Sequence, residues 1–434
     1  MRIFPFRQTE SMSHAEAISP EAAKRPAAMR FIMLTVLIDM ISIGLIIPVL
    51  PVLVGTFTSS KAEQSYWYMA VTFAFGIANF FGSPILGALS DRYGRRPVLL
   101  LGFCGLAINF FATALSTALW MLVAVRLVGG AMQSNIAVAN AYVADITPPE
   151  ERARRFGLLG AMFGVGFILG PMLGGFLGEH NPHLPFFVAG GLALLNLGYG
   201  YFVLPESLPA DRRRPFEWKR ANPINALTAL TQLHGAGLLV AVLAFTGLAQ
   251  FILYTSWVLY TSFKFGWTPY LNGVSLAVVG VVSVIVQGVL LGKLLKRYTP
   301  QRLAVIGLVS STLAYFAYGA APEGWMMYAI IVLNFLGFAV AASFQSIISS
   351  AAGADMQGQT MGAVSSLNSL TSVVAPLLGP PLLAMVSHLP PGDWRTGSPF
   401  YLCSALQLVG LVLAIVHFRG MRRQRLAAQA GSTA

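Results

Sequence analysis

The sequence predicts an all-α membrane protein with twelve transmembrane helices arranged in two six-helix bundles. Of its 434 residues, 56% are hydrophobic and 10% are charged, whereas about 25% of an average soluble domain is charged. The mean hydropathy is +0.68. Apolar runs of about 20 residues, the length that crosses a hydrocarbon core of about 30 Å, recur along the whole chain. These runs do not alternate with period two, which excludes a transmembrane β-barrel.

The apolar runs also predict where the helices lie. Their approximate positions are 31–54, 66–89, 97–116, 119–141, 156–178, 185–204, 236–259, 270–293, 302–320, 326–349, 359–386 and 398–418. The longest connection is rich in Arg and Pro and divides the runs six plus six. We therefore expect a cytoplasmic tail, an N-terminal bundle, a cytoplasmic linker, a C-terminal bundle and a second cytoplasmic tail, at 1–30, 31–204, 205–235, 236–418 and 419–434.

The distribution of Lys and Arg predicts the orientation. If the N-terminus is cytoplasmic, 24 of the 28 Lys and Arg residues fall in cytoplasmic segments, 3 fall in outside loops and Arg126 lies within a span. Because cytoplasmic loops carry the excess of Lys and Arg, both termini are predicted to be cytoplasmic. This placement of Lys and Arg on the cytoplasmic side explains the net charge of +12 without nucleic acid. The expected partner is the lipid bilayer, and nucleic acid is not expected as one. The polar first 30 residues do not resemble a signal peptide.

The two halves of the sequence resemble each other. Gly87-x-Leu89-x-x-Arg92-Tyr93 recurs as Gly292-x-Leu294-x-x-Arg297-Tyr298, 205 residues later, and Gly170-Pro171 recurs as Gly379-Pro380, 209 residues later. Several such echoes in the same order indicate an internal duplication. In transporters built from parallel six-helix repeats, the substrate site lies between the repeats near the bilayer midplane.

Asp39 is the acidic residue placed deepest in a predicted span. It follows Arg30 by nine residues, which is about 13 Å along a helix that rises roughly 1.5 Å per residue. An acidic residue at the bilayer centre costs about 2.5–3.5 kcal/mol, and burial favours its protonated form. Two interpretations stay open: a protonatable switch or cation site, and a structural Asp that hydrogen-bonds a neighbouring helix.

Arg126 is the one cation within a predicted span. It precedes Gly129 and Gly130, small residues that allow helices to approach closely. It is interpreted either as a charge partner or proton relay, or as a structural Arg that bonds backbone carbonyls.

A charged turn, Gly87–Pro97, links the second and third spans and is predicted to be cytoplasmic. Its charged residues and two others on the same side form a candidate cytoplasmic gate: Asp91, Arg92, Arg95, Arg96, Asp145 and Arg152. An exposed ion pair between Arg95 and Asp145 would contribute about 0–1 kcal/mol. A pair that is desolvated only when the inner face closes would act as a latch. The repeated turn has Lys296 in place of Asp91, so such a latch is one-sided.

A run of small residues lies in the fifth span: Gly166, Gly170, Pro171, Gly174 and Gly175. A dinucleotide-binding loop is excluded because no strand precedes it and the segment lies in the membrane. Small residues four apart let two helices touch, and Pro171 adds a kink. The run therefore predicts either helix packing alone or a tight closure against leak.

Polar side chains at mid-span depth in both halves are candidates for a substrate cavity. They are Asn79, Asn109, Gln133, Asn135, Gln250, Ser283, Gln287 and Ser311, together with the aromatic Trp257. Each alone is as well explained by hydrogen bonds between helices, and Trp257 by anchoring at the membrane interface. No metal spacing, cofactor motif, nucleotide-binding domain or catalytic constellation occurs, so we expect no metal, no cofactor, no enzymatic activity, and an ion gradient as the energy source.

Three of these motifs together resemble the major facilitator superfamily. Gly87-x-x-x-Asp91-Arg92-x-Gly94-Arg95-Arg96 is similar to its signature loop. Arg126-x-x-x-Gly130 and the small-residue run of the fifth span are similar to its proton-relay and antiporter motifs, and the latter is typical of drug/proton antiporters. The resemblance covers nearly all twelve spans. It implies small-molecule transport coupled to protons, by a protein that we expect to be functional as a monomer.

Within that superfamily the sequence resembles the bacterial tetracycline/proton antiporters. The matching segments are Asp39-x-x-x-x-Gly44-Leu-Ile-Ile-Pro-Val-Leu-Pro51, Arg92–Leu101, Gly178–Phe187, Trp257-Val-Leu and Phe265-Gly-Trp267. The resemblance implies important roles for Asp39, Asp91, Arg95, Arg126 and Asp145. It also implies that Arg95 pairs with Asp145, and that Asp91 caps the start of span eleven when the carrier faces outward.

The chain also departs from that family. Where the antiporters have an Asp in span three, a His in span eight and an Asp in span nine, this chain has Asn109, Ser283 and Ser311. Asn79 replaces a Gln of span two, whereas Gln287 and Trp257 are kept. These replacements count against tetracycline as a metal chelate and leave Asp39 as the mid-membrane proton carrier.

We therefore expect a multi-pass protein of the bacterial inner membrane that exports an amphipathic small molecule, tetracycline-like or another xenobiotic, in exchange for protons by alternating access. An uptake or export carrier for a metabolite or sugar, with the same fold, is the alternative.

Overall fold

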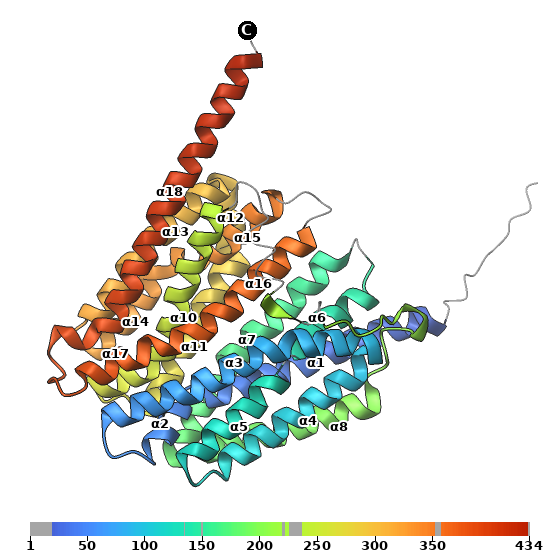
Figure 1. Ribbon diagram of the computed structural model, residues 1–434, viewed down its shortest axis with the longest axis horizontal. Helices are drawn as coiled ribbons and strands as arrows, with labels where there is room; N and C mark the ends of the chain where they lie inside the picture. Colours follow the sequence, from blue (N-terminus) through green and yellow to red (C-terminus); the bar gives the residue numbers. More distant parts are fainter. Residues whose placement is uncertain are drawn as a thin grey trace, which may run out of the picture.

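The computed structural model describes residues 20–133, 135–148, 151–218, 222–224, 237–351 and 357–432. Twelve helical spans are long and apolar enough to cross a membrane: Met29–Gly55, Lys61–Tyr93, Arg95–Ala114, Leu119–Ile146, Arg155–His180, Leu184–Val203, Gly237–Phe265, Pro269–Arg297, Pro300–Ala320, Gly324–Ile348, Val364–Val386 and Trp394–Met421. The predicted fold, twelve transmembrane helices in two six-helix bundles, is confirmed (Figure 1).

The first six spans build the N-terminal half. Their elements are α1 (Pro20–Ile46), α2 (Leu50–Gly55), α3 (Lys61–Tyr93), α4 (Arg95–Ala114), α5 (Leu119–Met132), α6 (Asn135–Ile146), α7 (Arg152–His180) and α8 (Leu184–Val203). A short 3-10 helix, η2 (Ala210–Arg212), follows in the predicted linker. Helix α1 thus begins ten residues before the predicted end of the N-terminal tail.

The last six spans build the C-terminal half. Their elements are α10 (Gly237–Phe265), α11 (Pro269–Ile285), η3 (Val286–Leu290), α12 (Leu291–Arg297), α13 (Pro300–Ala320), α14 (Gly324–Leu333), η4 (Asn334–Ala339), α15 (Val340–Ala351), α16 (Gln357–Val374), η5 (Ala375–Leu377), α17 (Gly379–Val386), η6 (Trp394–Gly397) and α18 (Ser398–Ser432). Helix α18 continues through most of the predicted C-terminal tail.

Two kinds of helix start occur along the chain. Thr268 and Thr299 cap α11 and α13 through their hydroxyl oxygens, which accept the backbone N–H three residues later. Pro269 and Pro300 follow at the first helical position, where a missing N–H leaves no donor unsatisfied. Helix α4 differs, because it begins directly after Gly94, which offers no side-chain cap. Gly94 has φ +105° and ψ 160°, a conformation that glycine alone adopts readily.

Five spans are interrupted, which the sequence ranges did not predict. Pro48, between α1 and α2, and Pro376, in η5, lack the N–H that a continuous helix needs. Span four breaks at Gln133, span eight passes through the π-helix η3, and span ten passes through the 3-10 helix η4. Irregular backbone at membrane depth is tolerated where protein buries it or where it lines a water-filled cavity. These helix breaks therefore mark positions within the membrane where functional residues are expected.

The two halves meet at one end of the molecule. Helices α7 and α11 approach so closely that a Cβ on Gly175 or Gly273 would overlap the backbone of the other helix. At the same end, the Glu179 carboxylate accepts the N–H of Tyr270 at 3.1 Å. Figure 1 shows the helices of the two halves side by side near α2 and α14, and diverging toward the end that carries α12. The diverging end is the predicted cytoplasmic one.

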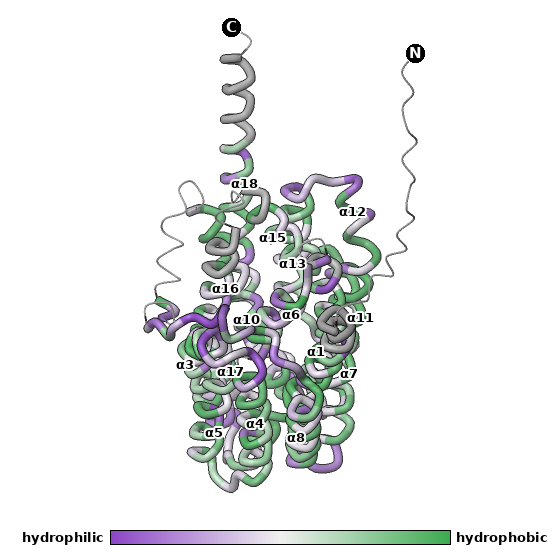
Figure 2. Tube along the Cα trace, turned by 90° about the vertical axis from the view of Figure 1, so that its right-hand side faces the viewer, coloured by the Kyte–Doolittle hydropathy of each residue, from purple (hydrophilic) through white to green (hydrophobic). Residues whose placement is uncertain are grey.

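The outer surface of the spans suits lipid. Large apolar side chains are exposed along the helices, among them Phe202 at 83% and Leu333 at 74%. A soluble monomer does not expose so much apolar surface. Figure 2 shows hydrophobic residues along the helices and hydrophilic ones gathered in the connections and at helix ends.

Candidate functional site

The charged turn between α3 and α4 folds around Arg95. Its Nε donates to Asp145 Oδ2 at 3.1 Å, and its Nη1 pairs with Asp91 Oδ1 at 2.6 Å. Nη1 also donates to Ser90 Oγ at 2.6 Å. Arg95 is only 9% exposed, and ion pairs are stronger away from water. The structure therefore brings together Arg95 and Asp145, as the sequence predicts, and adds Asp91 to the same cluster.

Glu206 holds the start of α4, and the sequence analysis missed it. Its Oε1 accepts the backbone N–H of Arg95 at 2.8 Å, and its Oε2 accepts that of Arg96 at 3.2 Å. The first N–H groups of a helix need such partners, because they have none within the helix. A carboxylate is also favoured at the positive end of the helix dipole. Glu206 lies 111 residues from Arg95, so the only signal in the sequence is an acid directly after span six.

The first residues of the predicted linker lie along this turn. Ser207 Oγ donates to Asp145 Oδ2 at 3.2 Å, and the backbone N–H of Arg214 donates to Asp91 O at 3.0 Å. We name residues 205–214 the linker strap. Through these bonds the strap connects the ends of α3 and α6, the helices that carry the two aspartates.

Three other candidate gate residues lie around the cluster. The Arg92 guanidinium lies over the ring of Tyr93, 5.1 Å from its centre, and Arg96 donates to Tyr201 O at 2.6 Å. Arg152 begins α7, and its side chain is outside the described part of the structure. Residues 352–356, which precede α16, are also outside it. The contact of Asp91 with the start of span eleven therefore stays a prediction.

Asp39 lies on α1, deep in the N-terminal half. It is 5% exposed and lines a small cavity with Thr35 and Asn135. The other lining residues are apolar: Val36, Met40, Leu99, Phe103 and Ala139. Asn135 is the first residue of α6, directly after the break in span four, and Gly102 leaves room for its amide. Asp39 is the one titratable residue of this lining, so a proton is the charge that can change there.

Arg126 forms a site of its own. It is 4% exposed on α5, and its guanidinium lies over Phe75, 5.8 Å from the ring centre, with Tyr68 as its second aromatic neighbour. Nε and Nη2 have no hydrogen-bond partner among the described residues. The face of an aromatic ring attracts a cation and offsets part of the cost of burying it. No ion pair joins Arg126 to Asp39, and a role for Arg126 in proton coupling stays a prediction.

The small residues of α7 face two different helices. Gly166, Gly170 and Gly174 pack on α1, where a Cβ on any of them would overlap its backbone or Met40. Gly175 instead faces α11 of the other half, and Pro171 contacts both helices, with its ring against Gly44 of α1 and its carbonyl group against Gly273 of α11. The run therefore serves packing within the N-terminal half and contact between the halves. Its role in closure against leak remains a prediction.

The candidate cavity residues of the N-terminal half lie at different depths. Asn79 and Gln133 are half-buried, and Gln133 marks the break in span four. Asn109 is 2% exposed, lies against Gly129, and its Oδ1 has no partner in the described structure.

The candidate cavity residues of the C-terminal half differ in how far they are exposed. Trp257 is 3% exposed and donates to Ser275 Oγ at 3.0 Å, and Gln250 accepts the hydroxyl of Tyr315 at 2.9 Å. Ser311 is also buried, beside Gly337. In contrast, Gln287 is exposed in the π-helix η3 and donates to Ser283 Oγ at 2.7 Å. Because π-helices are frequent at functional sites, Ser283 and Gln287 are the best placed of this group.

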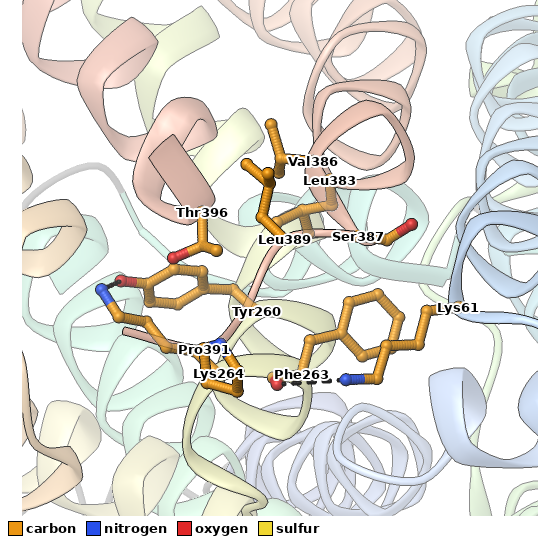
Figure 3. Close-up of a pocket in the computed structure, with 10 residues that line it drawn as sticks. All are labelled: Lys61, Tyr260, Phe263, Lys264, Leu383, Val386, Ser387, Leu389, Pro391 and Thr396. Atoms are coloured by element: carbon orange, nitrogen blue, oxygen red, sulfur yellow. Dashed lines mark hydrogen bonds between the residues drawn. The ribbon is translucent and has the colours of Figure 1, made fainter. Parts of the chain in front are cut away.

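A second cavity lies where the halves meet, and Figure 3 shows its lining. Lys61 of α3 donates to Phe263 O of α10 at 3.4 Å, which links the two halves. Lys264 donates to the hydroxyl of Tyr260 and to Gly319 O, both at 3.0 Å. Both ammonium groups therefore have oxygen partners from the protein itself, and the cavity belongs to the contact between the halves.

The described residues contain no group of three or more His, Cys, Asp and Glu that could hold a metal ion. Cys104 and Cys403 are free thiols in different halves.

Comparison with known proteins adds four findings. The family model of the Major Facilitator Superfamily matches residues 32–376. The tetracycline resistance protein, class C, of Escherichia coli is 35% identical over 376 residues, which are 86% of this chain and 94% of that protein. The class D protein of Salmonella ordonez is 34% identical over 392 residues, 90% of this chain and 96% of that protein. The solved nucleoside transporter NupG shares the fold, with a TM-score of 0.72 at 13% identity over 90% of this chain and 99% of that one.

Proposed function

The chain is a member of the major facilitator superfamily, a transporter of small molecules and not an enzyme, and on this premise we propose that it exports an amphipathic small molecule across the bacterial inner membrane in exchange for protons. The observation that carries the proposal is Asp39, the one titratable residue of a buried cavity inside the N-terminal half. A buried carboxyl group that is alternately protonated and charged can couple a proton to a change of conformation.

The proposed cycle uses the cluster around Arg95 as the cytoplasmic gate. Arg95 bonds Asp91 of α3 and Asp145 of α6, so movement of either helix end breaks an ion pair. Protonation and deprotonation of Asp39 favour opposite facings of the carrier. In this cycle the proton binds at Asp39 inside the N-terminal half, and the substrate binds between the halves.

The substrate class is supported by the relatives, which are named tetracycline resistance proteins. Asn109, Ser283 and Ser311 replace charged or titratable residues of that family, which disfavours binding of a metal-chelated drug. We therefore propose a tetracycline-like drug or another amphipathic xenobiotic as the cargo. Susceptibility of an efflux-deficient host, with and without the gene, tested against a panel of drugs, identifies it.

Everted membrane vesicles test the proton coupling. A substrate should discharge a preformed proton gradient in vesicles with the wild-type protein, and Asp39→Asn should abolish this discharge. Asp211→Asn, which changes an exposed acid of the linker strap, is the matched control and should behave as wild type. Full coupling in Asp39→Asn, or uptake of substrate by the host in place of export, contradicts the proposal.

A further inference from the structure

We propose that the cavity beside Asp39 is a water site through which this carboxyl group exchanges its proton, and that Thr35 and Asn135 hold the water. This inference rests on the proposed function, since it gives the proton of Asp39 a route. It assigns the role of holding this water to Thr35 and Asn135. Neither the sequence motifs nor the family resemblance gave a reason to expect that role.

Two polar atoms in the cavity wall have no partner among the described residues. They are Thr35 Oγ1 and Asn135 Nδ2, on side chains that are 1% and 4% exposed. A buried donor or acceptor without a hydrogen bond costs about 1–3 kcal/mol. Buried polar groups of this kind are usually satisfied by an ordered water. The side chain of Asn135 already hydrogen-bonds the Asp39 carboxyl group, although its amide nitrogen has no partner of regular hydrogen-bond geometry.

The cavity has the size of one water molecule. It offers about 10 Å³ to the centre of a water-sized sphere, which is close to the least space that one water needs. Asp39, Thr35 and Asn135 supply three polar partners, within the two to four that a buried water makes. The remainder of the lining is apolar and includes Leu99 and Phe103 of α4.

The polar groups favour water over a metal cation. A sodium site presents oxygen atoms to the ion, whereas the partnerless atom of Asn135 is an N–H donor. Its Oδ1 lies on the side of Gly102, where a Cβ would overlap it. A water can accept from Asn135 Nδ2 and donate to Asp39 and Thr35 at the same time.

The site continues toward the predicted cytoplasmic end of α1. Thr35 lies one helical turn before Asp39, and its carbonyl accepts the Nδ2 of Asn196 of α8 at 3.0 Å. Asn196 is fully buried, and its Oδ1 is a further atom without a partner in the described structure. In the proposed step the O–H bond of Asp39 breaks and leaves a carboxylate, the proton joins the water, and the water gives one of its other protons to solvent water at the predicted cytoplasmic side. Among the described residues of α1, α4 and α6, no other titratable side chain lines the cavity.

Infrared difference spectra between acidic and alkaline pH test the site without any substrate. The full-length protein in lipid is compared in ordinary water and in H₂¹⁸O. We expect a hydroxyl band of an internal water that shifts with the heavy isotope and disappears in Asp39→Asn. Thr35→Val and Asn135→Ala should lose the band, and Thr35→Ser, which keeps the hydroxyl, should retain it. Thr113→Val is the matched control, since Thr113 is fully buried but already donates to Asn109 O at 2.7 Å.

Proton flux is the second readout. Loss of one hydrogen bond to the water should slow substrate-driven flux about tenfold in Thr35→Val, with substrate affinity unchanged. If the flux and the isotope-sensitive band are both unchanged in Thr35→Val and Asn135→Ala, the water site is overturned and the proposed function still stands. A band that depends on Na⁺ would overturn it as well. An isotope-sensitive band in a wild-type protein without substrate-driven flux would support the water site and overturn the proposed function.

Discussion

The two repeated turns share an Arg–Tyr pair and differ in backbone and chemistry: Gly94 alone, at φ +105°, joins α3 to α4, whereas Tyr298 and Thr299, both at negative φ, join α12 to α13. At the end of α3 the Arg92 guanidinium lies over Tyr93, and after α12 the Arg297 guanidinium lies over Tyr298 in the same way. The next helix, α4 in the N-terminal half and α13 in the C-terminal half, then begins. In the C-terminal half Thr299 caps α13 with its own hydroxyl, so that turn is complete in itself.

The N-terminal turn depends on distant residues instead. Helix α4 has no local cap, and Glu206 of the linker strap supplies it. Arg95 and Asp145 add an ionic cluster that the C-terminal turn lacks, because Pro300 stands at the equivalent of Arg95. The Arg–Tyr pair is thus common to both halves, while among the described residues the N-terminal turn alone is bonded to other helices and to the linker strap. A gate needs such dependence on the position of other helices.

The largest effect is expected for Arg95→Ala. It leaves Asp91 and Asp145 without their shared cation. Arg95 is buried but both carboxylates are partly exposed to water, so the loss is expected to cost about 1–3 kcal/mol. We expect transport to be lost and the melting temperature in detergent to fall. Drug-resistance assays and thermal unfolding measure both.

Arg395→Ala is the matched control for that variant. Arg395 also pairs with an acid, Asp393, but in an exposed outer connection. Hydrogen bonds from Arg395 lower the pKa of Asp393 to about 2, so the pair is ionised at neutral pH. Exposed pairs of this kind contribute little, and transport should be unchanged. Equal damage from both variants would contradict a special role for the N-terminal turn.

Gly94→Ala is expected to have the second largest effect. The backbone at φ +105° and ψ 160° disfavours any residue with a Cβ, at a cost of about 1–3 kcal/mol. The added methyl group would also displace the Glu206 carboxylate. Reduced thermal stability and slower transport should follow. Gly292→Ala, in the repeated turn, has open space around its Cα and should be tolerated.

Glu206→Ala should have a smaller effect, because it removes a helix cap and leaves the ion pairs in place. Loss of a cap costs about 1 kcal/mol. Hydrogen exchange at the first amides of α4, those of Arg95 and Arg96, should accelerate. Exchange at the start of α13 should stay as in wild type, and acceleration at both helices alike would show a global loss of stability instead.

The smallest effect is expected for Thr299→Ala. It removes the cap of α13 at a cost of about 0.5–1 kcal/mol, and Pro300 still favours a helix start there. Stability should fall slightly while the transport rate per folded molecule stays unchanged. A transport defect as large as that of Arg95→Ala would show that the C-terminal turn is also a gate.

Local patterns in the sequence predicted much of this fold. Apolar runs of the right length gave the twelve spans, a signal of residue type and spacing that the bilayer makes strong. The pairing of Arg95 with Asp145 was sterically plausible from the sequence and was implied by the family resemblance.

Contacts between distant segments could not be predicted in this way. Glu206 caps α4 from beyond span six, and the place of Asn135 beside Asp39 depends on the break at Gln133. Helix breaks inside an apolar run leave the hydropathy unchanged; Pro48 and Pro376 are sequence signals for two of them, whereas the breaks at Gln133, η3 and η4 have no such signal. Trp257 shows the same limit, because its residue type suggests a ligand contact while its indole is bonded to Ser275 inside the C-terminal half.

Proton release on substrate binding tests the central claim most directly. Purified protein in weakly buffered detergent is mixed with the transported drug, and the pH of the solution is followed. We expect the wild-type protein to release protons, and Asp39→Asn to release none while still binding the drug. Release of the same number of protons by Asp39→Asn would contradict it.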